Sequence, residues 1–438
     1  MDTLVNGGYS TVATAPSPAT SGLTLVVAAG DGAKFPATGS FDVVLCPVGQ
    51  LPLFFGTNKN AEIARCTLVS TDTLTIVRAQ YGTTAQTVAV GWAVDNAVTA
   101  NLLSQLVAVS NASYAGKNAI INGGMEIAQR GTSFSGSGST TYGLDRWCFQ
   151  SSGSNTTFAQ SSSSPPAQFR YFQSVTETSA TSSTWYLAQS IETNNVIPFQ
   201  NQVVTLSFLY KMPVNFTNAV TVSLRYSTGT DANLLNAGTA ITITAGLNVN
   251  TSTGAITNES AWTQGTATFT VPSTATSLAV QFSSATDIVS TGQFNVTGVQ
   301  LELGSVMTPF SRSGGSIEGE LALCQRYYYE ANSAQASDVY NVYGAGQCIA
   351  VTNAVCYINF PVTMRAAPAT FTSSTASGFA IDSANGTGTS VTAIAMNRST
   401  PANADIAITV ASGMVAGNAT TLHSNANQTS WLGLSAEL

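Results

Sequence analysis

The only imidazole in the chain belongs to His423, and this limits the acid–base chemistry that the sequence can support. A Ser–His–Asp or Cys–His arrangement would have to use it. The residue lies in a polar, loop-like segment, residues 420–425, and no G-x-S-x-G nucleophile elbow accompanies it. We therefore expect His423 to be a solvated loop residue, and we expect a protein that is not an enzyme.

Metal and cofactor motifs are also missing from the sequence. It has no C-x-x-C pair, no histidine cluster, no D-x-D-x-D-G loop and no Walker or dinucleotide-binding loop. A calcium ion held by main-chain carbonyls and one or two aspartates stays open. The six cysteines are too few and too far apart for a disulfide scaffold, so we expect reduced, buried thiols, with Cys348 and Cys356 on neighbouring strands. No cofactor is expected.

Paired carboxylates for glycoside cleavage can come from distant parts of a chain, so they need a separate test. Glu126 and Asp145 stand near Arg130 and Arg146, which favours ion pairing over catalysis. Hydrolase activity stays open but has no support in the sequence. The carboxylates considered are Glu126, Asp145, Glu177, Glu192, Asp231, Glu259, Asp287 and Glu302.

Aromatic side chains are the stronger functional lead. Tryptophan and tyrosine combine an apolar ring, on which the C–H face of a sugar stacks, with a polar tip. Trp147 and Trp431 are expected in the core, because tryptophan is highly buried on average. The candidate glycan-binding residues are Trp185, Tyr186, Trp262, Tyr340 and Tyr343.

The composition points to binding or assembly. Charged residues make up 8% of the 438 residues, against about 25% in ordinary soluble chains. The net charge is −7 and the 14 basic residues are scattered, so nucleic acid is not an expected partner. We expect no export signal and no membrane insertion, since neither a signal-like start nor an apolar run of about 20 residues occurs. A surface this poor in charge suits a larger assembly.

Strand patterns cover most of the chain. β-branched runs near residues 23–27, 41–45, 61–66 and 74–78 predict a small N-terminal β-domain. Alternating apolar residues, such as Val204, Leu206, Phe208 and Tyr210, predict an antiparallel sandwich from residue 120 onward. Residues 318–330 have helical character, and further strands after them predict a smaller C-terminal β-domain with a terminal strand at Trp431.

Residues 95–114 have a different period. Thr99, Leu102, Leu106, Val109 and Ser113 are spaced three and four apart, which predicts a helix with a seam of about two heptads. A helix this short is marginal alone, so it packs either on its own chain or on copies of itself. Leu102, Leu106 and Val109 are the candidate oligomerisation residues.

Three stretches resemble phage tail-fibre and related appendage proteins. Residues 118–131 with 142–147, and residues 298–304 with 308–310, are similar to the opening and closing parts of a jelly-roll module akin to carbohydrate-binding modules. Residues 321–328 with 361–368 resemble the linker and C-terminal domain that follow such a module. Residues 78–85 resemble small β-domains at the virion end of fibres. The resemblance implies trimers, N-terminal docking to other virion proteins and C-terminal recognition of host surface polysaccharide.

These observations predict a mainly β chain with five parts. A short linking helix joins the N-terminal β-domain to an antiparallel jelly-roll sandwich, and a second short helix leads to a C-terminal β-sandwich. The predicted parts are residues 1–95 for virion docking, 96–117 as a helical linker or trimerisation segment, 118–313 as the carbohydrate-binding-like domain, 314–331 as a helical linker, and 332–438 as the C-terminal domain.

We expect a virion protein, assembled in the host cytoplasm, that recognises host glycans as a tail fibre or receptor-binding appendage. The alternatives are a purely structural head, neck or tail decoration or adaptor protein and, less favoured, a capsule-degrading tail spike. The absence of a long repeat or heptad run favours a short appendage over a long-shaft fibre.

Overall fold

Strands form almost all of the regular structure in the computed structural model. It divides into two compact units, Met1–Ser113 and Tyr114–Leu438. Every strand pair among the described residues is antiparallel, and the predicted mainly β class is confirmed. No helix among the described residues is long and apolar enough to span a membrane. The structure describes residues 8–37, 40–50, 60–96, 99, 116–153, 155–178, 183–216, 218–287, 292–333, 340–382 and 388–438.

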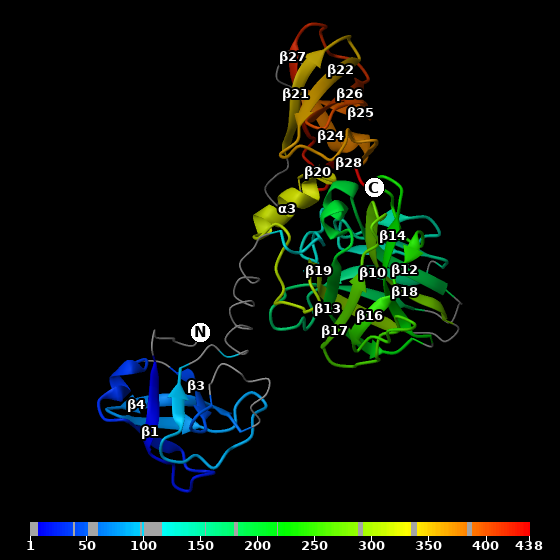
Figure 1. Cartoon of the computed structure of the whole chain (residues 1–438). Coiled ribbons are helices and arrows are strands. Elements are labelled where there is room, and N and C mark those ends of the chain that lie inside the picture. The colour runs from blue at the N-terminus through cyan, green and yellow to red at the C-terminus, as the bar shows by residue number, and fades with distance from the viewer. Residues whose placement is uncertain are drawn as a thin grey trace. The chain divides into compact units, whose positions relative to one another are not determined.

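The first unit contains a closed six-stranded barrel, visible in blue in Figure 1. Apolar side chains such as Val43, Leu45, Leu74 and Ile76 fill it, and closure leaves no unpaired strand edge. The four strands predicted from β-branched runs are all present. In barrel order, with a 3-10 helix η1 (Asp31–Lys34) beside them, the strands are β1 (Tyr9–Thr14), β2 (Thr24–Val27), β5 (Thr73–Val77), β4 (Glu62–Ser70), β3 (Phe41–Cys46) and β6 (Ala93–Asp95).

A buried ion pair between Glu62 and Arg78 organises one loop of this barrel. The two side chains are 0% and 6% exposed, and Arg78 donates from Nε and Nη2 to the two carboxylate oxygens at 2.6 Å each. Arg78 also donates to the main-chain oxygens of Ala19 and Gln86, while Glu62 accepts from the main-chain nitrogens of Ala79 and Gln86. The pair therefore fixes the segment that follows β5.

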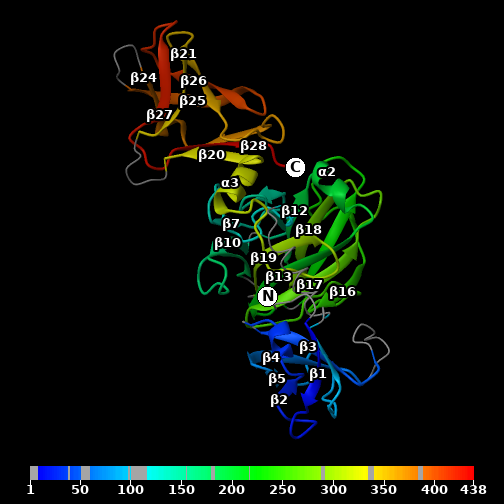
Figure 2. The same ribbon diagram turned by 60° about the vertical axis from the view of Figure 1, so that its left-hand side comes forward.

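The second unit begins with the predicted antiparallel sandwich, which is confirmed as two facing sheets (Figures 1 and 2). The short helices α2 (Thr193–Val196) and η2 (Ile197–Phe199) join two of its strands. The seven-stranded sheet runs β16 (Ile243–Leu247), β17 (Thr263–Thr270), β13 (Val203–Val214), β19 (Gln293–Leu303), β11 (Phe172–Glu177), β10 (Thr156–Ser161) and β7 (Ser133–Ser135). The six-stranded sheet runs β15 (Thr239–Ala240), β14 (Val220–Ser227), β18 (Ser277–Asp287), β12 (Ser183–Ile191), β9 (Cys148–Ser151) and β8 (Thr141–Tyr142).

The strand β13 shows how the sequence alternation places side chains. Val204, Leu206, Phe208 and Tyr210 are all fully buried in the core between the sheets, as their spacing predicts. The residues that alternate with them, and Lys211 directly after Tyr210, therefore face away from the core. This outward face of the seven-stranded sheet carries the candidate site described below.

The two sequence stretches that resemble the opening and closing of a jelly-roll module lie side by side. The Asn118 side chain donates to the main-chain oxygen of Val299 at 3.1 Å and accepts from the main-chain nitrogen of Leu301, both on β19. A Cβ atom on Gly123 would collide with the Val299 oxygen, so only glycine allows this close approach. These contacts join the first and last parts of the sandwich.

The helix predicted over residues 318–330 is only partly correct. Helix α3 (Ile317–Gln325) begins at the cap residue Ser316, whose hydroxyl accepts from the main-chain nitrogen of Gly319 at 3.1 Å. The tyrosines that follow belong instead to strand β20 (Tyr328–Asn332), because β20 pairs with strand β28 (Trp431–Ser435) about a hundred residues later. Local periodicity cannot anticipate such a distant partner.

Strands β20 and β28 belong to the C-terminal domain, which has two parts. In Figures 1 and 2, β20, β28 and α3 lie between the sandwich and the rest of this domain. The sequence predicts a sandwich here, whereas in the structure six of the strands close into a barrel. Alternation along a strand does not distinguish a sandwich from a barrel, because both have one buried face. A three-stranded sheet runs β20, β28 and β23 (Thr370–Ser373). The barrel runs β21 (Val342–Cys348), β22 (Asn353–Asn359), β26 (Asn403–Val410), β25 (Gly388–Ser399), β24 (Phe379–Asp382) and β27 (Ala419–Ser424), with the 3-10 helix η3 (Ala376–Gly378) before β24.

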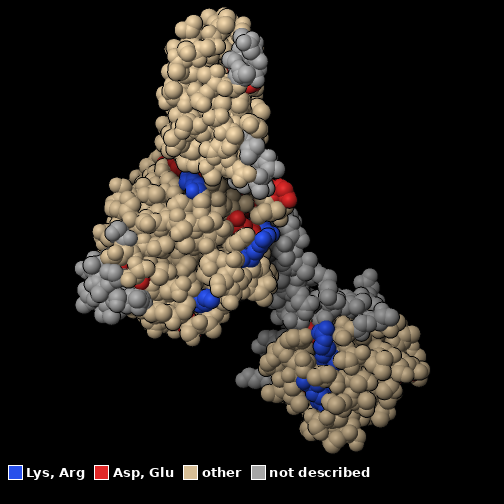
Figure 3. Space-filling view, turned by 180° about the vertical axis from the view of Figure 1, so that it is seen from behind, with Lys and Arg blue, Asp and Glu red and all other residues tan. Residues whose placement is uncertain are grey.

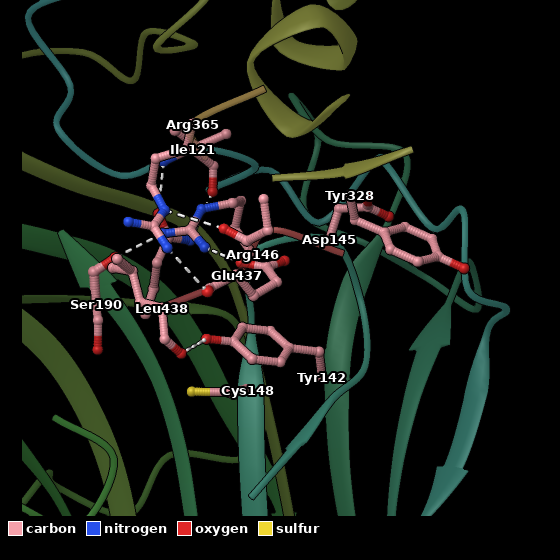
Figure 4. Close-up of polar contacts among 12 residues, drawn as sticks. Ile121, Tyr142, Asp145, Arg146, Cys148, Ser190, Tyr328, Arg365, Glu437 and Leu438 are labelled. Carbon is pink, nitrogen blue, oxygen red and sulfur yellow. Dashed lines mark hydrogen bonds and ion pairs between the residues drawn. The ribbon is translucent and has the colours of Figure 1, made fainter. Parts of the chain in front are cut away.

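Glu437 and Leu438, which follow β28, contact the sandwich, as Figure 4 shows. The Glu437 carboxylate accepts hydrogen bonds from Arg146, which is 2% exposed, and from Arg130 at 3.2 Å. The Tyr142 hydroxyl donates to the main-chain oxygen of Leu438 at 2.9 Å. Buried charges and main-chain groups thus tie the C-terminal domain to the sandwich.

Candidate functional site

An aromatic cluster on the outer face of the seven-stranded sheet is the candidate functional site. Trp262 is half-buried, and its ring meets that of Phe172 edge to face, with centroids 5.2 Å apart. The Lys211 ammonium lies 4.9 Å from the Trp262 centroid and 5.5 Å from that of Phe172. The indole nitrogen donates to the main-chain oxygen of Ser164 at 2.9 Å, which fixes the orientation of the ring.

Neighbouring strands bring these residues together. Trp262 precedes β17, whose first residue, Thr263, is the register partner of Tyr210 on β13, next to Lys211. Lys211 is in turn the register partner of Asn295 on β19. Phe172 opens β11, the next strand of the same sheet.

A row of small polar side chains continues the cluster across the sheet. Asn295 is the register partner of Ser174 on β11, and the Gln293 amide donates to the Ser174 hydroxyl at 3.1 Å. The buried Asn295 Oδ1 has no hydrogen-bond partner among the described residues. A buried acceptor without a donor costs about 1–3 kcal/mol, which a water molecule or a ligand hydroxyl would relieve.

This arrangement suits binding rather than proton transfer. The Trp262 ring offers an apolar face, the ammonium of Lys211 offers donors, and the adjoining amides and hydroxyls offer both donors and acceptors. Lys211 has no carboxylate partner among the described residues, and no carboxylate is among the residues of the cluster. Figure 3 shows one face of the molecule, on which the described charged side chains form only small clusters.

The structure separates the predicted glycan-binding aromatics. Trp262 lies in the cluster, and Tyr340 is 64% exposed on the C-terminal domain, with its ring centroid 6.3 Å from that of His423. Tyr186 is half-buried and packs against the apolar cluster of Cys148, Ala188 and Leu235. Nothing brings these three residues to one site.

Two of the predicted binding residues need correction. Trp185 is fully buried, because β12 directs it into the core, where it contacts Phe158, Phe216 and Phe294. Tyr343 is 7% exposed, and its hydroxyl donates to the main-chain oxygen of Ser430 at 2.7 Å. Neither ring is open to a sugar. The candidate oligomerisation residues Leu102, Leu106 and Val109 lie outside the described residues.

The structure also corrects the expected setting of His423. It belongs to β27 and its side chain is 13% exposed, so it is a strand residue and not a solvated loop residue. Its Nε2 atom lies 3.3 Å from Asp382 Oδ1, and its Nδ1 atom lies 2.9 Å from the Ser424 main-chain oxygen. Both ring nitrogens are therefore engaged by the fold.

Of the two carboxylates near arginines, Glu126 forms an ion pair with a partner other than the expected one, and Asp145 is held by hydrogen bonds and forms no ion pair among the described residues. Glu126 pairs with Arg312 at 2.6 Å, a residue 186 positions away. Asp145 is fully buried and accepts from the main-chain nitrogen of Gln129 at 2.7 Å, and burial raises the pKa of its carboxyl to about 6. Arg130 and Arg146, the expected partners, both pair with Glu437 instead.

The search for other reactive groups gives a similar picture. All six cysteines are buried free thiols, and β21 and β22 place Cys348 and Cys356 on neighbouring strands. Burial raises the pKa of the Cys148 and Cys356 thiols to about 12. Among the described residues, no group of three or more histidines, cysteines or carboxylates is arranged to hold a metal ion.

Sequence reasoning missed Phe172, Lys211 and Asn295 as members of the cluster. The alternation along β13 places Lys211 on the outer face, so that part of the signal was present in the sequence. The register between strands that are fifty or more residues apart could not be predicted from the sequence, because alternation does not specify which strands pair. Trp431 was expected in the core and is half-buried.

No protein-family model and no curated protein matches the chain. Solved structures give partial matches. The enzymatically active domain of a tailspike protein from bacteriophage CBA120 has 16% identity and a TM-score of 0.29, over 43% of this chain and 22% of that one. A putative sugar binding protein from Bacteroides thetaiotaomicron has 12% identity and a TM-score of 0.29, over 43% of this chain and 100% of that one. A xylan-binding domain from Paenibacillus barcinonensis has 13% identity and a TM-score of 0.26, over 44% and 99% of the two chains.

Proposed function

We propose that the chain is a glycan-binding appendage protein of a phage particle. In this proposal the outer face around Trp262 binds a saccharide of the host surface, and the chain binds without cleaving it. The N-terminal barrel attaches to other virion proteins, and three copies assemble in the host cytoplasm into a short appendage of the virion.

One observation carries the binding function. Trp262 is a half-buried tryptophan held in place by Phe172, Lys211 and a hydrogen bond to Ser164, on a sheet face that also carries the amides and hydroxyl of Asn295, Gln293 and Ser174. An ordered aromatic ring with hydrogen-bonding neighbours matches the two faces of a sugar, one of C–H groups and one of hydroxyls. A weak single site is sufficient in a trimer, because linked copies raise the effective affinity about 10²–10⁴-fold.

The surface composition supports the same function. With 8% charged residues, the polar groups of the chain are mostly hydroxyls and amides, which contact sugars without the desolvation cost of charges. The virion role is supported by the sequence resemblance of residues 118–131, 298–304 and 78–85 to appendage proteins.

The test is binding of the full-length chain to an array of bacterial surface polysaccharides. We expect binding to at least one polysaccharide, and at least a tenfold loss when Trp262 is replaced by alanine. Tyr9→Ala is the matched control, since Tyr9 is an exposed aromatic residue (49%) of the N-terminal barrel. Equal binding by the Trp262→Ala and wild-type chains would remove the Trp262 face from the proposal.

A further inference from the structure

A cavity between the sandwich and the three-stranded C-terminal sheet has the features of a second saccharide site. Its volume is about 540 Å³, within the range of about 300–1,000 Å³ typical of small-molecule sites. The sandwich contributes Arg130 and Tyr142 to its wall, and the C-terminal domain contributes Tyr328, Glu330 and Trp431. The cavity therefore exists only where both domains meet.

The C-terminal wall of the cavity is one face of a sheet. Register pairs place Tyr328 opposite Ser435, Asn332 opposite Trp431, and Thr370 opposite Ser435. These residues share a face because side chains two positions apart point the same way. The residues between them, Leu432 and Leu434, are fully buried in the core of the C-terminal domain. The face that remains carries Tyr328, Glu330, Trp431 and two threonines, Thr370 and Thr372.

Arg130 and Gly433 organise the aromatic part of the wall. The Arg130 guanidinium lies 3.6 Å from the centroid of Tyr328 and 5.4 Å from that of Tyr142, so it holds both rings. A Cβ atom on Gly433 would collide with the Tyr328 hydroxyl. Glycine at this position lets the Tyr328 side chain lie across β28 and donate to Glu330 at 2.8 Å.

Glu330 is the acceptor left for a ligand. It accepts from the Tyr328 hydroxyl at 2.8 Å and from the Asn332 amide at 3.2 Å, which uses about two of its roughly four acceptor positions. The other carboxylate of the wall, Glu437, is engaged by Arg146 and Arg130. Burial raises the pKa of the Glu330 carboxyl, in keeping with its enclosed position.

The charges around the cavity decide the class of ligand. The formal charges of Arg130 and Arg146 are balanced by the carboxylates of Glu437 and Glu330, so the cavity has no net positive charge that would favour an anion. A half-buried Trp431, the hydroxyls of Thr370 and Thr372, and one free carboxylate edge suit a ring with C–H faces and vicinal hydroxyls.

We propose that this cavity binds a neutral sugar residue, distinct from the site on the sandwich face. This inference rests on the proposed function for its ligand class, and it adds a second site formed jointly by two domains. Because both domains contact the ligand, binding holds them together.

The experiment uses the full-length chain labelled with 5-fluorotryptophan. The chain has five tryptophans, and Trp431→Phe and Trp262→Phe variants assign the two relevant fluorine resonances. The probes are D-glucose, D-galactose, D-mannose, L-rhamnose and N-acetyl-D-glucosamine as neutral sugars, with D-glucuronate and N-acetylneuraminate as anionic ones. We expect at least one neutral sugar to shift the Trp431 resonance, and Glu330→Gln to weaken its apparent affinity about tenfold, the loss expected for a charge-assisted hydrogen bond.

The two resonances separate this inference from the proposed function. A shift of Trp262 alone supports the sandwich site and overturns the cavity site, whereas a shift of Trp431 alone does the reverse. No shift of either resonance overturns both. A Trp431 shift produced only by the anionic sugars contradicts the neutral class, and an unchanged affinity in Glu330→Gln contradicts the role of that carboxylate.

Discussion

The Glu437 carboxylate bonds to the guanidinium of Arg146, although the two residues are 291 positions apart in the sequence. Arg146 is 2% exposed, stacks 3.5 Å from the Tyr327 centroid and donates to the Ser190 main-chain oxygen at 2.7 Å. The pair thus joins the end of the chain to the interior of the sandwich (Figure 4). The cavity proposed as a sugar site depends on this connection.

Replacing Glu437 by glutamine should strongly destabilise the second unit. The change leaves the Arg146 guanidinium buried without its counter-charge, and breaking a buried pair costs about 3–5 kcal/mol. Calorimetric unfolding of the full-length chain measures the loss. The double variant Arg146→Met with Glu437→Leu should recover part of it, because the buried Arg146 charge is removed together with its partner, while Arg130, 13% exposed, still loses its contact with Glu437. If the double variant is as unstable as the sum of the singles, the two residues are not coupled.

The buried Asp145 should make the stability depend on pH in an unusual direction. Burial raises the pKa of its carboxyl from 3.8 to about 6, so the folded state binds the proton more tightly than the unfolded state. This contribution is fully present below pH 4 and is lost as the pH rises through 6. Relative to Asp145→Asn, the wild type should lose about 2–3 kcal/mol of unfolding free energy between pH 4 and pH 7. Urea unfolding at several pH values measures it, and parallel curves for the two proteins would contradict the assignment.

The Arg78–Glu62 pair should be essential to the N-terminal barrel. Lysine cannot reproduce the two parallel hydrogen bonds to Glu62 or the bonds to main-chain oxygens, so Arg78→Lys should cost about 3 kcal/mol. The control is Lys34→Met, which removes a surface pair whose lysine is 50% exposed and should cost less than about 1 kcal/mol. Thermal unfolding of the first unit measures the loss of stability in both variants. Equal losses would show that burial of the Arg78–Glu62 pair does not account for its contribution to stability.

Trp185 and Trp262 should respond to truncation in opposite ways. Trp185→Ala empties a fully buried site and should cost about 3–5 kcal/mol of stability. Trp262→Ala removes a half-buried ring from the sheet face, so stability should fall much less while saccharide binding is lost. Melting temperatures and binding of both variants, measured side by side, check this contrast. A Trp262→Ala chain that unfolds as readily as Trp185→Ala would indicate a structural role.

Much of the fold could be predicted because its signals are local. The alternation of Val204, Leu206, Phe208 and Tyr210 correctly identified a strand with one buried face. The β-branched runs of the first hundred residues marked strands of the barrel, and the strand at Trp431 is present. Each of these inferences needs only a side-chain period of two within one segment.

The site was harder to predict because it depends on which strands become neighbours. The same amphipathic strand buries Trp185 and leaves Tyr186 half-exposed, and which face meets the core follows from the partner sheet. The local pattern around Tyr328 has helical character. Its strand conformation depends on pairing with Ser435, about a hundred residues later, which the local pattern does not contain. Glu126 and Asp145 had arginines nearby in sequence, yet their contacts are with Arg312 and Gln129.

The most direct test of the glycan-binding account is isothermal titration of the array polysaccharide that binds best, into the wild-type and Trp262→Ala chains under identical conditions. The account predicts that the Kd rises at least tenfold in the variant while its melting temperature stays within a few degrees of wild type. An unchanged Kd, or no polysaccharide bound by the wild type, would contradict the account and favour a purely structural role in the virion.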